Sequence, residues 1–356
     1  MRVTANKRVD FECFVHVNCQ SCKNVTMELD SLDRSLLSAL HTDGRAPWPK
    51  IASDIGRSVS TVRRRYESLQ HRGIVRVIGR TDVSRLGYGP PAMVKYRGRD
   101  ALRPEFLTHL QRHPHVRYLS ATVGSAHCLA EIVPQSLSSL REILSDIGRD
   151  FEVTSEEFVV THTYTSGQDW LPNTAKRDID VEILSREVEL SADERNILGM
   201  LLHDGRASFA SLGAASDKSE STVRRIVETL FEQEIVSLRL LVEPQVLGFQ
   251  AMFWALLDIE PSRLPEAASS LAENPATKTL FATAGSCNLI GQFVLPRHTD
   301  TYAFMTQVLG ALPGARSAET LLESATYKRV WNLVKGDSYG EVAGPAWLFD
   351  GKSRDR

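Results

Sequence analysis

The chain has 356 residues and a formal net charge of −2, with 42% apolar and 24% charged residues. This length suggests two to four domains, and the composition is that of a globular protein rather than a disordered or collagen-like one. Neither a long apolar run nor a secretory signal pattern is present, so we predict a cytoplasmic protein that does not span a membrane. Five cysteines argue against a disulfide framework.

An internal repeat organises the sequence. DGRA at Asp43 recurs at Asp204, and STVRR at Ser60 recurs at Ser221, with the same spacing of 161 residues. From Asp33 to Val75 this spacing never breaks, and 17 of 43 positions are identical. The chain therefore contains two copies of one long unit rather than a solenoid of short repeats.

The front of each unit predicts three helices. In the first copy, leucines at helical spacing from Leu32 to Leu40 precede DGRA, and a short helix ends at Gly56. A third helix begins near Ser58 and ends at Gly73. Two short helices, a turn and an arginine-rich helix form the helix-turn-helix pattern.

The back of each unit alternates strand and helix in the order βαββαβ, a ferredoxin-like arrangement. The fold class is therefore α+β, a tandem repeat of a winged helix-turn-helix followed by a βαββαβ domain. Exposed sheet faces need a partner, so we expect the two βαββαβ halves to pack together as an intrachain pseudo-dimer. Further association into a homo-oligomer is also expected.

The predicted domain boundaries follow from the repeat. They are an N-terminal extension without stable structure (1–27), a first helix-turn-helix (28–88), a first βαββαβ domain (89–165), a linker (166–188), a second, degenerate helix-turn-helix (189–249), a second βαββαβ domain (250–334) and a disordered tail (335–356). Cys13, His16, Cys19 and Cys22 in the extension lack a supporting fold. We therefore predict no metal site, no cofactor and no catalytic residues.

The stretch from LDRSLLSALHTDGRA through STVRRRYESLQHRGIV resembles the helix-turn-helix of the Lrp/AsnC, or feast/famine, transcription regulators. The βαββαβ half after LGY is similar to the effector-binding and oligomerisation domain of that family. The resemblance covers about residues 28–165 and 189–332, and it implies a regulator that binds double-stranded DNA. It also implies modulation by a small molecule such as an amino acid or related metabolite.

The charges support DNA binding independently of the resemblance. From Arg57 to Arg85 the chain holds eight basic and two acidic residues, a local charge of +6, whereas the matched window Lys218 to Val246 has −1. Such a concentration of arginine is what phosphate neutralisation requires. Hydroxyls at a helix start can contact phosphates, and arginines in the first turns can contact base edges. The predicted DNA-binding residues are Ser58, Ser60, Thr61, Arg63, Arg64, Arg65, Ser219, Ser221, Thr222, Arg224 and Arg225.

The resemblance also places an effector site in the hairpin between the middle strands. The two hairpins read GSAH and GSCN, so a family aspartate is replaced by His127 and Asn288. A neutral side chain pairs less well with a ligand ammonium than an aspartate does, which argues against an amino-acid effector. The alternative is that Gly124 and Gly285 only permit a tight hairpin turn. The predicted effector-binding residues are Thr122, Gly124, Ser125, His127, Thr283, Gly285, Ser286 and Asn288.

Two other functions remain open. Siroheme decarboxylases resemble the same two-part fold and also pair two units, but the histidine- and arginine-bearing motif of that family is missing from VRYLSATVG and TKTLFATAG. A protein-interaction module with a vestigial helix-turn-helix is the third class. No nucleophile triad, phosphate loop or paired-carboxylate motif is present.

Overall fold

The computed structural model describes residues 29–166, 187–345 and 348. The predicted N-terminal extension, with its cysteines, and nearly all of the predicted linker lie outside these residues. Both units follow the predicted order of a helix-turn-helix and then βαββαβ, which confirms the α+β fold class.

The first unit contains α1 (Ser31–Thr42), α2 (Trp48–Ile55), α3 (Val59–His71), β1 (Arg76–Arg80), η2 (Val83–Leu86), β2 (Ala92–Arg97), α4 (Pro104–Arg112), β3 (Val116–Val123), β4 (Cys128–Ile132), α5 (Leu137–Gly148) and β5 (Thr154–Thr165). The second unit contains α7 (Ala192–His203), α8 (Phe209–Ser216), α9 (Glu220–Glu232), β6 (Ser237–Leu241), η3 (Pro244–Leu247), β7 (Ala251–Ile259), η4 (Pro261–Arg263), α10 (Leu264–Glu273), β8 (Thr277–Ala284), β9 (Leu289–Leu295), α11 (Asp300–Gln307), η5 (Leu309–Ala311) and β10 (Ala315–Arg329). Two more strands follow, β11 (Asn332–Lys335) and β12 (Ser338–Val342).

The two βαββαβ halves close into one barrel, as the intrachain pseudo-dimer prediction requires. The first part of β5 pairs with β2 of its own unit, and its second part pairs with β8 of the other unit. In the same way β10 pairs first with β7 and then with β3. The strand order β10-β3-β4-β2-β5-β8-β9-β7 therefore returns to β10 and leaves no free edge in the ring.

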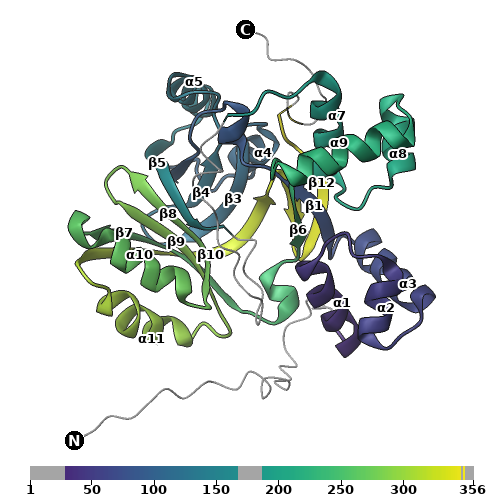
Figure 1. Ribbon diagram of the computed structural model, residues 1–356. Coiled ribbons are helices and arrows are strands. Elements are labelled where there is room, and N and C mark those ends of the chain that lie inside the picture. Colours follow the sequence, from purple (N-terminus) through teal and green to yellow (C-terminus); the bar gives the residue numbers. More distant parts are fainter. Residues whose placement is uncertain (1–28, 167–186, 346–347, 349–356) are drawn as a thin grey trace, which may run out of the picture.

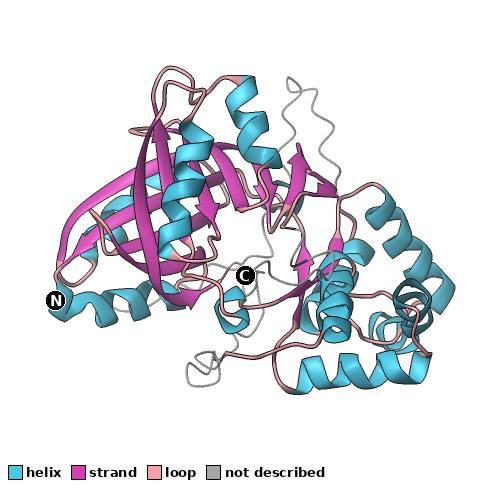
Figure 2. Cartoon of the chain, turned by 90° about the horizontal axis from the view of Figure 1, so that it is seen from above, coloured by secondary structure: helices cyan, strands magenta, loops and turns pink. Residues whose placement is uncertain are grey.

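Side chains alternate between the inside of the barrel and its helix-covered outside, as strands with two buried faces require. Val94 and Tyr96 of β2 pack outward with α4 and α5, whereas Met93 packs inward with Trp254 of β7. Helices α10 and α11 cover the strands of the second unit in the same manner. Figure 2 shows these helices outside the strands, with the helix-turn-helix domains on one side of the barrel.

The two helix-turn-helix domains are joined by a ribbon and by a reciprocal clasp. Strands β1 and β6 pair antiparallel between them (Figure 1). Arg45 donates to the carbonyl oxygens of Gly205 and Ala207 at 3.0 and 2.9 Å. Arg206, its counterpart, donates to the carbonyl oxygens of Gly44 and Ala46. The two DGRA segments thus contact each other through reciprocal hydrogen bonds.

Each helix-turn-helix core is completed by the opposite unit. Val242 and Val246 of the second unit pack into the core of α1, α2 and α3. Val83 and Leu86 of the first unit pack into the core of α7, α8 and α9. The two helix-turn-helix domains are therefore linked to each other through crossed segments.

The prediction of a disordered tail over 335–356 is wrong where the structure describes this segment. Strand β12 pairs with β11, and Tyr339 is buried, with its hydroxyl donating to Glu243 and its backbone N–H donating to the Gly73 carbonyl oxygen. The glycines and charges of the segment suggested disorder, but the apolar side chains of Val334 and Tyr339 form a small core with β1 and β6.

The end of the third helix differs between the copies. Gly73 has φ +71°, and a Cβ there would lie 2.6 Å from the Tyr339 carbonyl oxygen. Its counterpart Glu234 adopts φ +54°, in a region that costs about 1–2 kcal/mol for a residue with a Cβ. The second copy therefore keeps the left-handed backbone conformation of the first copy but lacks the glycine that adopts it without strain.

We expect Glu234→Gly to raise the free energy of unfolding by about 1 kcal/mol because it removes this left-handed strain. Glu228→Gly, at an exposed position inside α9, should instead lower it by about 1 kcal/mol. Thermal and urea unfolding of the two variants against the parent chain measures both changes. Equal destabilisation by the two substitutions would contradict the strain assignment.

Candidate DNA-binding surface and central cavity

The start of α3 has the geometry expected of a DNA-contacting helix. Ser58 is the N-cap, and its Oγ accepts the Thr61 backbone N–H at 3.2 Å. The Ser60 and Thr61 hydroxyls lie 3.0 and 2.8 Å from the same oxygen. These exposed hydroxyls surround the positive end of the helix dipole, where phosphate oxygens are favoured.

Arg63 and Arg64 extend from the first turns of α3 into solvent. The Arg63 Nε contacts Glu67 Oε1 at 2.8 Å, but its side chain is 63% exposed. A surface pair of this kind is worth little and is readily exchanged for a phosphate or a base edge. Both arginines are therefore available to a ligand that approaches the N-terminal half of α3.

Arg65 has a different environment from its two neighbours. Its guanidinium donates to the Asp30 carboxylate and lies 3.3 Å from Asp33 Oδ1. These two carboxylates form the capping box of α1, and burial raises the pKa of Asp33 while Arg65 opposes that rise. Arg65 thus ties α3 to α1, which leaves its guanidinium less available to DNA than those of Arg63 and Arg64.

Other arginines counted in the +6 window also face the protein. Arg76 donates to Asn332 Oδ1 at 3.0 Å, and Arg80 lines a central cavity. Arg85 is buried and donates to the carbonyl oxygens of Gln233 and Glu234 at the end of α9. The window charge therefore overstated the positive field at the DNA-facing surface of the first copy.

The second copy presents the same backbone with other side chains. Ser219 caps α9 as Ser58 caps α3, with Ser221 and Thr222 beside it. Arg224 contacts Glu220 at 3.3 Å and stacks 4.4 Å from the centre of the Phe209 ring. The counterpart of Arg65 is Ile226, which is buried in the core of the domain.

The exposed charged side chains differ between the two copies in the direction that the sequence predicts. Between 57 and 73 the exposed side chains comprise four arginines and one glutamate, a balance of +3. Between 218 and 234 they comprise one lysine, two arginines and four glutamates, a balance of −1. Lys218 is paired with Asp193 at 2.8 Å, and Arg225 remains exposed. The first copy thus offers the more positive surface.

The predicted effector residues lie at the two hairpins between the middle strands, and most of their polar groups serve the hairpins themselves. Thr122 and Thr283 each donate across their turn at 2.9 Å. The Asn288 amide bonds both the N–H and the carbonyl of Ile259, and the His127 backbone N–H bonds the Tyr96 carbonyl. Gly124 lies against β10 and Gly285 against β5, while Ser125 is exposed.

An ion-pair cluster around a buried lysine lies beside the GSCN hairpin. Lys95 is 2% exposed, and its Nζ contacts Glu156 and Glu319 at 2.8 and 2.9 Å. The Ser286 hydroxyl donates to Glu156, and Lys95 and Ser286 both lower the pKa of that carboxylate. Sequence reasoning missed this cluster, although a lysine within the apolar strand AMVKY signals a buried partner.

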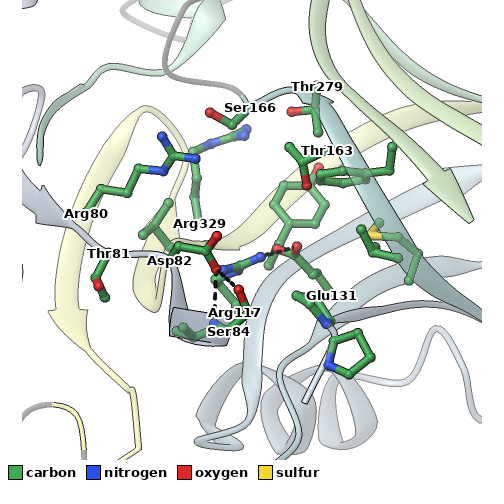
Figure 3. Close-up of a pocket in the computed structure, with 18 of the residues that line it drawn as sticks. Arg80, Thr81, Asp82, Ser84, Arg117, Glu131, Thr163, Ser166, Thr279 and Arg329 are labelled. Carbon is green, nitrogen blue, oxygen red and sulfur yellow. Dashed lines mark hydrogen bonds and ion pairs between the residues drawn. The ribbon is translucent and has the colours of Figure 1, made fainter. Parts of the chain in front are cut away.

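A cavity of about 380 Å³ lies between the barrel strands and the helix-turn-helix layer. Its walls come from β1, the segment 81–84, the barrel strands, α7 and β6. None of the eight predicted effector residues lines it. Figure 3 shows Arg80, Arg117, Thr163, Ser166 and Thr279 around the opening.

Arginines that line the cavity form ion pairs with carboxylates. Arg117 pairs with Glu131, at 2.8 Å from its Nε to the carboxylate, and Arg329 pairs with Glu243 at 2.7 Å. Burial raises the pKa of the Glu243 carboxylate, but Arg329, Lys278 and the Tyr339 hydroxyl together lower it below its usual value. Sequence reasoning missed this site because its members come from many strands; an arginine inside VRYLSATV was the available signal.

The part of the chain that the structure describes has no helix that is long and apolar enough to cross a bilayer. Within the same residues, no group of three histidine, cysteine or acidic side chains is arranged to hold a metal ion.

The model of the AsnC-type helix-turn-helix domain matches residues 29–70, which contain α1, α2 and nearly all of α3. The chain is 26% identical over 152 residues to the HTH-type transcriptional regulator PH0140 of Pyrococcus horikoshii, covering 42% of this chain and 95% of that protein. Residues 29–70 are therefore an AsnC-type helix-turn-helix domain, and the chain is similar to regulators of the Lrp/AsnC family. It is also 26% identical over 146 residues to the transcriptional regulator LrpA of Mycobacterium tuberculosis, covering 40% of this chain and 97% of that protein.

Solved structures show likeness across most of the chain. The siroheme decarboxylase NirDL superposes with a TM-score of 0.59 at 12% identity, covering 89% of this chain and 97% of that one. A second structure of NirDL, in complex with an iron-uroporphyrin III analogue, gives 0.58 at 13% identity, covering 84% and 93%. At these identities the likeness concerns the fold, and it shows that the paired arrangement occurs elsewhere.

We expect Arg65→Ala to lower the free energy of unfolding by about 1 kcal/mol, because it leaves the buried Asp33 carboxylate without its cation. Arg64→Ala, at the adjacent exposed position, should change it by less than about 0.5 kcal/mol. Urea unfolding followed by circular dichroism measures both. Similar losses of stability for the two variants would contradict a special role of Arg65 in holding α3 on α1.

Proposed function

We propose that the chain is a sequence-specific DNA-binding transcriptional regulator whose first helix-turn-helix supplies most of the affinity for double-stranded DNA. The observation that carries the proposal is the exposed pair Arg63 and Arg64 beside the hydroxyl-rich start of α3. The balance of +3 against −1 on matched surfaces supports the dominance of the first copy.

The proposal includes control of DNA binding or assembly by a small-molecule effector. A direct contact between the helix-turn-helix layer and the barrel supports it, because Arg329 of β10 pairs with Glu243 of the second helix-turn-helix domain at 2.7 Å. A ligand that shifts one layer against the other would change how the two helix-turn-helix domains are presented.

Association of chains into a homo-oligomer is also part of the proposal. Val123 of β3 and Leu322 of β10 lie opposite each other in the register and are 62% and 41% exposed. Two adjoining exposed apolar side chains at the barrel end favour contact with another surface. Sedimentation velocity with Val123→Ser as the matched variant tests this association.

We expect the double substitution Arg63→Ala and Arg64→Ala to nearly abolish specific DNA binding, because an arginine that contacts a base edge contributes about 1–3 kcal/mol of binding free energy. The matched pair Arg224→Ala and Arg225→Ala should weaken binding much less. Fluorescence anisotropy on an operator selected from random DNA, repeated over a range of salt concentrations, measures both effects.

Both pairs are exposed, so the melting temperature should hardly move and serves as the control for folding. Equal weakening of DNA binding in the two folded double variants would refute the dominance of the first copy. The second helix-turn-helix would then contribute equally to DNA binding, with its glutamates facing away from the DNA.

A second candidate function, catalysis in the central cavity, is favoured by one observation: His162, a residue type suited to proton transfer, lines a cavity that also holds four arginines. NirDL, whose fold is similar, is a siroheme decarboxylase. Incubation of the purified chain with siroheme, followed by mass spectrometry, tests this candidate. Turnover that disappears in His162→Ala would favour an enzyme over a regulator.

A further inference from the structure

We propose that residues 330–342, which we call the C-terminal hairpin, are the positioning element of the DNA-binding layer. They hold both helix-turn-helix domains on the barrel and so fix the spacing of α3 and α9. The hairpin consists of the turn 330–331 and the strands β11 and β12. Its effect on DNA recognition rests on the proposed function, whereas the positioning itself does not.

The barrel holds the base of the hairpin. Strand β11 folds back on the end of β10, where Asn332 pairs with Arg329. The Trp331 backbone N–H donates to the Arg117 carbonyl oxygen of β3 at 3.0 Å. The Trp331 indole N–H donates to the Pro114 carbonyl oxygen, just before β3, at 3.0 Å. The start of the hairpin is therefore fixed to two strands of the barrel.

The turn at the base of the hairpin has a strained backbone. Val330 and Trp331 have φ +48° and +60° in succession. Left-handed backbone is unfavourable for residues with a Cβ, and it persists only where the surrounding contacts impose it. The hydrogen bonds of Trp331 to the barrel are contacts of this kind. The turn therefore has one imposed shape, which determines where the Trp331 ring lies.

The hairpin completes the core of the second helix-turn-helix domain. Trp331 is 4% exposed and belongs to the core that contains the buried side chains of α7, α8 and α9. Val330 and Val342, from the two ends of the hairpin, pack against the same core. Movement of this domain away from the hairpin would expose a large apolar ring to water, which is unfavourable.

The same hairpin holds the C-terminal end of α3. The Tyr339 backbone N–H donates to the Gly73 carbonyl oxygen at 2.8 Å, two residues after the end of α3. From β1, Arg76 donates to Asn332 Oδ1 at 3.0 Å and to the Tyr339 carbonyl oxygen at 3.2 Å. The first helix-turn-helix domain is therefore hydrogen-bonded to the hairpin backbone directly behind its recognition helix.

The Tyr339 side chain joins the hairpin to the ribbon and to the barrel. Its hydroxyl donates to Glu243 Oε1 at 2.6 Å, and the same carboxylate accepts from the Arg329 Nε of β10 at 2.7 Å. All three side chains are buried. The Tyr339 ring belongs to a small core with Ile78 of β1 and Leu241 of β6. Figure 1 shows β12 beside these two strands.

One short segment thus contacts the barrel and both helix-turn-helix domains. With these contacts in place, α3 and α9 should keep a single separation. Successive half-sites on one face of DNA lie about 34–36 Å apart for each helical turn. A fixed separation of the two recognition helices would therefore make the chain select one spacing of half-sites.

The experiment measures distances between spin labels in the full chain by double electron–electron resonance. The cysteines within 1–27 are replaced by serine, and the buried Cys128 and Cys287 are kept. Labels at Ser68 on α3 and Glu228 on α9, both exposed, report the separation of the recognition helices. The parent chain should give one narrow distance distribution.

Two substitutions each remove one attachment. Tyr339→Ala and Trp331→Ala should widen the α3–α9 distribution at least about twofold, because domains without a fixed contact move relative to each other. Lys335→Ala, at an exposed position of the same hairpin, is the matched control and should leave the width unchanged. Unchanged widths in both of the first two variants would refute the positioning role.

A label pair within the barrel separates positioning from loss of folding. Ser145 on α5 and Thr306 on α11 are exposed, and their distance distribution should stay narrow in every variant. If the alanine variants widen this pair as well, Tyr339→Phe decides, since it keeps the ring and removes only the bond to Glu243. It should still widen the α3–α9 distribution, and an unchanged width would refute the proposal.

The effect on DNA has its own readout. Insertion of two base pairs between the half-sites of a selected operator should weaken binding of the parent chain at least about threefold, and that of Tyr339→Ala by less. Equal weakening in the two proteins would refute control of spacing but leave the positioning standing. Absence of DNA binding by the parent chain would refute the proposed function, while the label distances would still decide on the hairpin.

Discussion

The structure depends on two strands that each serve both units. Because β5 and β10 pair with their own unit at one end and with the other unit at the opposite end, neither βαββαβ half can close its sheet alone. The same crossing places each helix-turn-helix on core residues of the opposite unit. Joining both units in one chain makes this exchange intramolecular, so it does not depend on protein concentration.

A tandem chain can diverge where a homodimer cannot. Contacts that hold the pair together have stayed symmetric, as the reciprocal donation by Arg45 and Arg206 shows. Positions that face outward or support a single copy have changed: Arg65 holds α1, whereas its counterpart Ile226 is a core residue. The result is one scaffold with two unequal surfaces and a shared cavity between its layers.

The sequence was sufficient to predict the repeat, the helix-turn-helix and the βαββαβ order, because each depends on local periodicity or on identity between the copies. It also located the N-cap serines, whose geometry is local. It was insufficient for Arg80 and Arg85, because a net charge does not say which arginines point inward. The cavity and the β11–β12 hairpin were missed because both depend on contacts between distant segments, such as Tyr339 with Gly73.

The chain contains two helix-turn-helix domains, and we infer that the first, through α3, makes most of the contacts with DNA. The most direct measurement is photo-crosslinking to operator DNA from a benzoylphenylalanine placed at Ser60 or at the matched Ser221, both exposed on the first turn of their helices. This account predicts strong crosslinks from Ser60 and weak ones from Ser221, the difference widening as salt is raised. Equal crosslinking from both positions at every salt concentration would contradict it.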